Sequence, residues 1–293
     1  MRSILWRIIL LLPNFSAVAI AEDVALTAPP ASEPASPVPW LVTLYEAGDY
    51  QGVRTEALRL GYDGLSDPRL RAEVEYLHAL ALLELDEAGP GTRKLEALRL
   101  GEGAPQVTEM AELTLAGNWV DIAPSQAARQ YQGYLSAHPD GQWRHYAAVE
   151  AARSYAMDGN FPVALSALQA EQVPVSPALN SALSTPVRWR RPVLAAALSG
   201  ALPGAGQLYT RHPKEALSAF AVNTLFFSGM AWAAHERAWP TFGVLAFFGA
   251  GFYVGNIYGA ADSAIRANRA LRDEVMDSFE AELGPPPGPP LPP

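Results

Sequence analysis

Five histidines and scattered carboxylates are the side chains with which this chain could perform acid–base or metal chemistry. Glu75 and His78 have the Glu-x-x-His spacing of half a di-iron motif, but such a centre needs a second copy and two further carboxylates. The sequence contains no Gly-x-Ser-x-Gly, no His-Glu-x-x-His and no Walker-type phosphate loop. We therefore expect no catalytic residue, no metal, no cofactor and no enzymatic activity, and interpret His78 as a surface or groove histidine.

Neutral amides within apolar stretches are the other side chains that could do chemistry, and the chief ones are Gln207, Asn223 and Asn256. Carriers usually keep ionisable groups near the middle of the membrane, and these stretches contain only neutral polar groups. Amides inside bilayers also join helices by hydrogen bonds. A small transporter or channel component, with these amides along its path, is therefore the alternative function.

The composition excludes several classes of protein. A net charge of −9 argues against nucleic acid as a partner, because phosphate binding needs a basic face. The absence of cysteine rules out disulfides, thiolate zinc sites and an N-terminal lipoprotein anchor. With 49% hydrophobic and only 17% charged residues, the chain is unusually apolar for a soluble protein.

The N-terminus has the pattern of a secretory signal peptide. Arg2 and Arg7 flank an apolar run, and Ala19-Ile20-Ala21 precedes an acidic pair. We expect residues 1–21 to be a signal peptide cleaved after Ala21, with an uncleaved membrane anchor as the alternative. Residues 22–39 are rich in Pro, Ala and Ser, and we expect a disordered linker because they cannot bury enough apolar surface to offset ordering entropy.

The elements that must position any site are helices. Across residues 40–185, apolar residues at three- and four-residue spacing alternate with short Gly, Asp and Pro turns. One phrase recurs: Gly48-Asp49-Tyr50 matches Gly159-Asn160-Phe161, and three units of roughly 37 residues fit the offset between them. The turn of an intermediate unit is expected at residues 87–89. The pattern predicts an all-α fold of stacked helix pairs, since each pair exposes too much apolar surface alone.

Residues 131–168 resemble the tetratricopeptide family, with a His138-Pro139 break, the Gly159-Asn160-Phe161 turn and small residues where two helices approach. The resemblance implies a helical-repeat solenoid whose concave groove holds a protein or peptide. The expected groove aromatics, each of which could instead pack between helices, are Trp119, Tyr131, Tyr134 and Trp143.

Residues 186–272 have the composition of a membrane module. Residues 215–235 and 239–261 are apolar and long enough to cross a hydrocarbon core of roughly 30 Å. Residues 192–209 are apolar too, but Pro203, Gly204 and Gly206 predict an interrupted helix.

The interrupted segment could cross the bilayer or dip into it. If it crosses, the clusters around Arg211 and Arg266 both lie in the cytoplasm, as the positive-inside bias requires, and we favour this arrangement of three crossings. If it is re-entrant, every large basic cluster stays on the exported side. The choice decides the side on which the C-terminal tail lies.

The membrane module resembles a family of bacterial inner-membrane proteins of unknown function with a Pro-Gly-x-Gly-Gln-x-Tyr motif before a helical hairpin. The resemblance implies membrane location without implying an activity. The residues of the expected membrane-module signature are Pro203, Gly204, Gly206, Gln207, Tyr209, Asn223, Tyr253, Gly255, Asn256 and Asn268.

Residues 273–293 are expected to form an acidic and then Pro-rich disordered tail. The final prolines favour polyproline II, which is either a solvated end or a ligand for a proline-reading groove. The whole pattern predicts an inner-membrane scaffold that holds its repeat domain in the periplasm and binds a protein or peptide of the cell envelope. The membrane module is also expected to be capable of self-association.

Overall fold

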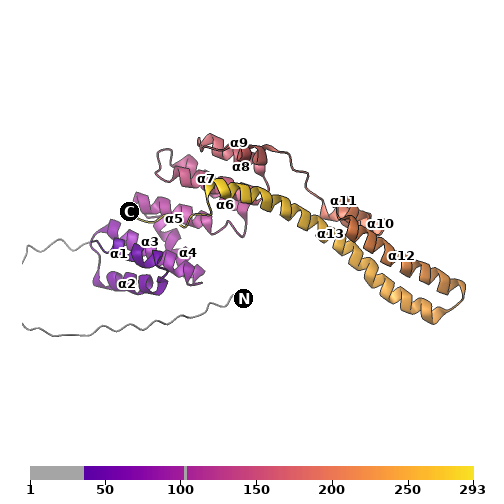
Figure 1. Ribbon diagram of the computed structural model, residues 1–293. Helices are drawn as coiled ribbons and strands as arrows, with labels where there is room; N and C mark the ends of the chain where they lie inside the picture. Colours follow the sequence, from indigo (N-terminus) through magenta and orange to yellow (C-terminus); the bar gives the residue numbers. More distant parts are fainter. Residues whose placement is uncertain (1–35, 102–103) are drawn as a thin grey trace, which may run out of the picture. The chain divides into compact units, whose positions relative to one another are not determined.

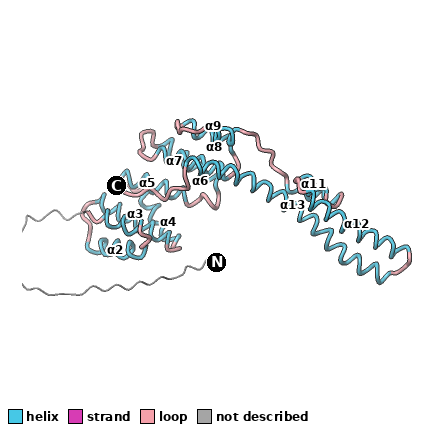
Figure 2. Tube along the Cα trace, in the orientation of Figure 1, coloured by secondary structure: helices cyan, strands magenta, loops and turns pink. Residues whose placement is uncertain are grey.

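The computed structural model describes residues 36–101 and 104–293, and all regular structure within these ranges is helical (Figure 2). The predicted signal peptide and most of the predicted linker lie outside the described residues. The first helix, α1, begins at Val38, inside the range predicted as linker. The helices of the first part of the chain are α1 (Val38–Glu46), α2 (Tyr50–Asp63), α3 (Pro68–Glu84), α4 (Ala88–Arg99), α5 (Pro105–Gly117), α6 (Pro124–Ala137), α7 (Arg144–Met157), α8 (Phe161–Ala170) and α9 (Pro177–Ser184).

The recurring Gly-Asp/Asn-aromatic phrase forms the same turn twice. Gly48 and Gly159 both adopt a left-handed backbone, with φ of 76° and 79°. In each case the next residue donates its amide to a carbonyl five residues earlier, at 2.9 Å for Asp49 and 2.8 Å for Asn160. A glycine is favoured here because a Cβ atom disfavours positive φ. Asp86 forms the intermediate turn with φ of 62°, one residue before the position predicted for it.

The cores of these helices are built from buried aliphatic and small residues. Leu41, Leu77 and Leu80 are fully buried in a cluster that joins α1 to α5. Ala148 and Ala152 on α7 are likewise buried, where α7 packs against α6 and α8. Small side chains at this position allow the helix axes to approach closely, as predicted for the unit at residues 131–168.

The second part of the chain contains α10 (Pro192–Ala201), α11 (Ala205–Tyr209), α12 (Pro213–His235) and α13 (Trp239–Leu283). Helices α12 and α13 pack side by side as a hairpin (Figure 1). Both helices are long and apolar enough to span a membrane, with 23 and 45 residues. Their large apolar side chains are exposed, including Leu225 at 73% and Phe247 at 76%.

The C-terminal part of α13 differs from the prediction. The helix continues past residue 261 to Leu283, where a disordered acidic tail was expected. Val275 and Phe279 are buried against Leu168 and Leu183 of α8 and α9, so an apolar stripe holds this part of the helix in place. The Glu282 carboxylate accepts hydrogen bonds from the amide and hydroxyl of Ser176 at 2.5 Å, at the start of α9. Acidic composition alone did not reveal this apolar stripe.

Candidate functional site

The interruption in residues 192–209 lies between α10 and α11. Helix α10 ends at Ala201, and Gly204 takes a left-handed backbone with φ of 90°. In a continuous helix, the amide of residue 203 would donate to the Ser199 carbonyl, four residues earlier. Pro203 has no amide hydrogen and cannot make this bond. The turn at Gly204 likewise removes the helical donor of the Gly200 carbonyl. Two carbonyls and the Gly204 amide therefore need partners outside the helix.

Helix α13 supplies these partners. The Asn256 side-chain amide donates to the Ser199 carbonyl at 3.1 Å, and its side-chain oxygen accepts from the Gly204 amide at 3.2 Å. The Tyr253 hydroxyl donates to the Gly200 carbonyl. Side chains of α13 therefore satisfy these three backbone groups. Such compensation is what a broken helix needs where water is excluded.

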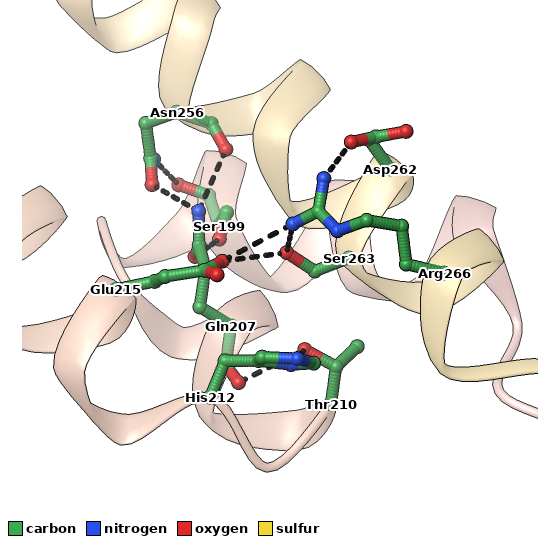
Figure 3. A network of polar contacts seen from close by, with 9 residues as sticks. All are labelled: Ser199, Gln207, Thr210, His212, Glu215, Asn256, Asp262, Ser263 and Arg266. Carbon is green, nitrogen blue, oxygen red and sulfur yellow. Dashed lines mark hydrogen bonds and ion pairs between the residues drawn. The ribbon is translucent and has the colours of Figure 1, made fainter. Parts of the chain in front are cut away.

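Gln207 completes a buried cluster with Ser199 and Asn256, which we call the amide cluster (Figure 3). The Ser199 hydroxyl donates to the Gln207 side-chain oxygen at 2.7 Å and accepts from the Gly206 amide at 2.9 Å. The Gln207 side-chain amide donates to the side-chain oxygen and the carbonyl of Asn256, both at 3.1 Å. Because every side chain in the cluster bonds the others or the turn, the cluster fixes the path of the interrupted segment.

The glycines of the turn are required by close packing. A Cβ atom on Gly206 would overlap the Ala195 carbonyl oxygen and come within 2.7 Å of the Ala260 Cβ atom. A Cβ atom on Gly204 would overlap the Ala216 carbonyl oxygen. Gly255 has nothing within 4 Å of its Cβ position. The packing therefore explains the first two glycines of the signature and leaves Gly255 without a steric role.

The interrupted segment starts and finishes beside the same part of α13, near Asn268. Before α10, the amide and carbonyl of Arg190 bond the side chain of Asn268, at 2.7 and 2.8 Å. After α11, the Tyr209 hydroxyl accepts from the Arg191 amide at 3.2 Å, and the Arg190 guanidinium lies 5.4 Å from the centre of the Tyr209 ring. Both ends of residues 192–209 thus meet near Asn268. The segment folds back on itself beside α13, and this arrangement supports the re-entrant alternative over the arrangement of three crossings.

The start of α12 is held to α13 by a second, more exposed network (Figure 3). The Ser263 hydroxyl donates to the Glu215 carboxylate at 2.9 Å, and the Arg266 guanidinium donates to Ser263 at 3.0 Å and pairs with Asp262. Asn223 stands apart from both networks, since its amide donates to the Ala219 carbonyl of its own helix at 2.8 Å. Within the described residues, no hydrogen bond joins Asn223 to Gln207 or Asn256.

The four aromatic residues predicted for a groove lie in different places. Trp119 and Tyr134 line one cavity of about 770 Å³, whereas Tyr131 is buried and lines another of about 700 Å³. Trp143 packs between the hydrophobic clusters and lines neither cavity. The Tyr134 hydroxyl donates to the Glu109 carboxylate at 2.6 Å. Burial is the main cause that raises the pKa of Tyr134 above its usual value, and this hydrogen bond is the second. The four residues are therefore divided between these two cavities and the packed core.

The 700 Å³ cavity, which we call the tail groove, has the chain's own C-terminal segment on one side. Helices α3, α5 and α7 contribute Leu80, Thr114 and Arg153 to its wall, and the Pro-rich tail contributes Pro286 and Pro289. Tyr76 and Arg153 bond this tail, and neither residue was predicted to belong to a site. A usable signal was the Glu150–Arg153 spacing, which places two charges on an alanine-rich helix that must be buried.

Arg153 is the principal charged group of the tail groove. Its side chain is fully buried, donates to Glu150 at 2.9 Å and lies 5.1 Å from the ring centre of Phe279 on α13. Burial raises the pKa of Glu150, and the neighbouring Arg153 guanidinium opposes that rise. The Nη1 atom of the Arg153 guanidinium lacks a hydrogen-bond partner and lies 3.8 Å from a carboxylate oxygen of Glu280. Arg153 therefore joins α7 to the C-terminal part of α13 through its contacts with Phe279 and Glu280.

His78 is buried on α3 rather than exposed. Burial and the nearby Lys94 lower its pKa, while Glu75 opposes this. Glu75 pairs with Lys94, and the described residues contain no cluster of three or more potential metal-ligating side chains.

Comparisons with protein-family models, with curated proteins and with solved structures find no match to this chain.

Proposed function

We propose that this chain is a membrane-anchored helical scaffold that binds a protein or peptide partner in the bacterial cell envelope. The membrane part of the proposal is supported by the exposed apolar surface of α12 and α13. Leu225 on α12 and Phe247 on α13 are more than 70% exposed, and Trp232 and Trp239 flank the hairpin tip. Large apolar side chains exposed along two packed helices favour membrane or protein contact, and aromatic residues at helix ends suit a bilayer interface.

The binding part of the proposal is supported chiefly by the tail groove, in which helices α3, α5 and α7 face an extended segment of the chain. Helical pairs of the tetratricopeptide type use such concave surfaces to hold peptides. The resemblance of residues 131–168 to that family supports this view, as does the turn shared by Gly48 and Gly159. The second cavity, beside Trp119, adds an exposed aromatic surface where a partner could also contact the scaffold.

We further propose an inner-membrane location with the helical pairs in the periplasm. Two crossings, by α12 and α13, would keep the helical pairs and the C-terminal tail on the same side. The export signal predicted in residues 1–21 would make that side the periplasm. The basic residues Arg190, Arg211 and Arg266 would then also lie there. Long translocated domains largely escape the positive-inside bias, so the large domain between signal and hairpin makes this orientation compatible with the charges.

The alternative, a transporter or channel component, has weaker support. Gln207 and Asn256 use their amides to satisfy the interrupted helix and each other. Asn223 bonds its own helix. These contacts favour a structural role for all three amides. The exposed faces of α12 and α13 would also accommodate self-association of the membrane module, which the scaffold proposal includes.

Photocrosslinking from the chain in its native membrane tests the scaffold. A photoreactive residue at Ile122, which is exposed and lines the Trp119 cavity, should capture a defined protein. The matched control is Leu100, which is equally apolar and exposed but lines neither cavity. A crosslinked protein specific to Ile122 is the expected result. Adducts that are identical at both positions, or absent at both, would contradict partner binding at this surface.

A further inference from the structure

We propose that the tail groove is a binding site for proline-rich extended peptides and that the chain's own residues 284–293 are its resident ligand. The inference rests on the proposed scaffold function and names the class of partner that this groove would take. Such a partner would have to compete with the tail.

The tail is positioned by the end of α13. Gly284 adopts a left-handed backbone with φ of 82°, which ends the helix and redirects the chain. Pro290 and Pro292 are buried, and Leu291 packs against the hydrophobic cluster of α1 to α5. A segment with seven prolines in its last nine residues has few conformations to lose on binding, because each ring fixes φ. The entropy cost of seating it is therefore small.

The groove offers donors where the tail offers acceptors. Proline has no amide hydrogen, so a polyproline segment presents almost only carbonyl oxygens. The Tyr76 hydroxyl donates to the Pro290 carbonyl at 2.7 Å, and the Arg153 guanidinium donates to the Gly284 carbonyl at 2.9 Å. Tyr131 and Tyr146 add aromatic surface to the wall. Aromatic-lined grooves with hydrogen-bond donors are the common solution for recognising polyproline II.

The buried hydroxyls allow the tail to leave and return. Tyr76 lies 2.8 Å from the Thr114 hydroxyl, and either oxygen can be the donor of that bond. With the tail seated, Tyr76 donates to Pro290 and accepts from Thr114. With the tail released, Tyr76 can donate to Thr114, while Thr114 donates to the Met110 carbonyl at 2.9 Å. Neither buried hydroxyl is left unpaired in either state, so release carries no large desolvation penalty at this point.

The tail leaves part of the groove unfilled. Pro286 and Pro289 form one side of the cavity, and about 700 Å³ remains between them and the helices. A proline-rich peptide with larger side chains between its prolines could fill this volume as well as replace the tail. Such a peptide would gain contacts that the tail lacks, which is how a partner in trans would overcome the high effective concentration of a tethered competitor.

A distance measurement on the full-length chain in lipid nanodiscs tests the proposal. Because the chain has no cysteine, Asp121→Cys and Pro293→Cys introduce one spin label beside the groove and one at the end of the tail. We expect a narrow distance distribution. A synthetic peptide of sequence GPPPGPPLPP should broaden it by displacing the tail, whereas the same peptide with alanine at every proline should not.

Tyr76→Phe gives the matched test of recognition, and Tyr155→Phe is its control. Tyr155 donates to Gln132 and does not contact the tail. Tyr76→Phe should increase the released fraction of the tail roughly fivefold relative to the control, and should therefore broaden the resting distribution. A resting distribution that is already broad in the unsubstituted chain, or equal displacement by the proline and alanine peptides, would overturn the proposal. Either result would leave crosslinking from Ile122, in the other cavity, as an independent test of the scaffold.

Discussion

The side-chain amide of Asn256 bonds the carbonyl of Ser199, which lies four residues before Pro203. In an uninterrupted helix, the amide of residue 203 would donate to this carbonyl, but Pro203 has no amide hydrogen. A residue on α13 therefore replaces a hydrogen bond lost from α10, and the same side chain accepts from Gly204, the next residue after the proline. This pairing explains why an interrupted segment can pack stably against the hairpin.

Asn256→Leu should destabilise the membrane module by about 3 kcal/mol. The substitution leaves the Ser199 carbonyl and the Gly204 amide without their partner in a buried position, and it removes one of the hydrogen bonds of the Gln207 side chain. Asn223→Leu is the matched control, because that buried amide bonds only its own helix, and its loss should cost under about 1 kcal/mol. Thermal unfolding in detergent, followed by circular dichroism, measures both. Equal losses of stability would contradict the assigned role of Asn256.

Gly206→Ala should cost about 2 kcal/mol or more, because the added methyl group overlaps the Ala195 carbonyl oxygen and crowds Ala260. Gly255→Ala adds the same group where nothing lies within 4 Å, and the better helix propensity of alanine should make it neutral or stabilising by up to about 1 kcal/mol. Unfolding of the two variants in the same detergent compares them directly. A loss at Gly255 as large as that at Gly206 would refute the packing explanation.

Arg153→Met should destabilise the contact between α7 and α13 by about 3–5 kcal/mol at neutral pH, because it leaves Glu150 as a buried unpaired charge. The pKa of Glu150, already raised by burial, should rise further without the guanidinium. A raised folded-state pKa means that the folded chain binds the proton more tightly than the unfolded chain. The variant should therefore regain stability as the pH falls through that pKa, levelling off near the ordinary pKa of glutamate.

The control for this pH effect is the double variant Glu150→Gln with Arg153→Met, which has no charge to titrate at the site. Its stability should lack the rise on acidification and exceed that of Arg153→Met at neutral pH. Chemical unfolding between about pH 5 and pH 8 provides the comparison. If the single and double variants have the same pH dependence, Glu150 is not the titrating group.

His78 should make stability depend on pH in the opposite direction. Burial, followed by the charge of Lys94, lowers its pKa below the ordinary value of 6.5, so the unfolded chain binds this proton more tightly. The stabilisation associated with neutral His78 is complete above pH 6.5 and is lost as the pH falls through the window between 6.5 and the lowered pKa. His78→Gln should reduce this loss, whereas the exposed His145→Gln should not. Thermal unfolding on both sides of the window measures the difference, and equal curves for the two variants would exclude His78.

Single cysteines at Asp140, Arg211 and Glu236 test the two-crossing arrangement, because all three positions are exposed and the chain has no other cysteine. A membrane-impermeant thiol reagent should label Asp140→Cys and Arg211→Cys from the same side, which we propose to be the periplasm. Glu236→Cys, at the hairpin tip, should be labelled only after the membrane is opened. Labelling of positions 140 and 211 from opposite sides would mean that residues 192–209 cross the bilayer after all.

Local patterns in the sequence determined most of the secondary structure. Three- and four-residue apolar spacing predicted the helical pairs, because that spacing puts side chains on one face of a helix. The glycines at 48 and 159 marked turns, since they adopt positive φ without a steric cost. Pro203 and Gly204 predicted the interruption, and uncharged stretches predicted the hairpin helices. Each of these properties depends on residues close together in the chain.

Only the tertiary structure decided what these elements do to one another. Nothing near Asn256 in sequence shows that it meets Ser199, and the reversal of residues 192–209 depends on Asn268 meeting Arg190. The same is true of Tyr76 and Pro290, which are 214 residues apart in the sequence. The positive-inside bias favoured a third crossing because it counts the basic residues beside each apolar segment and takes no account of how the segments pack. The physical reason for the difference is that a buried polar group selects its partner by position in space, and helices of known length can still pack in several ways.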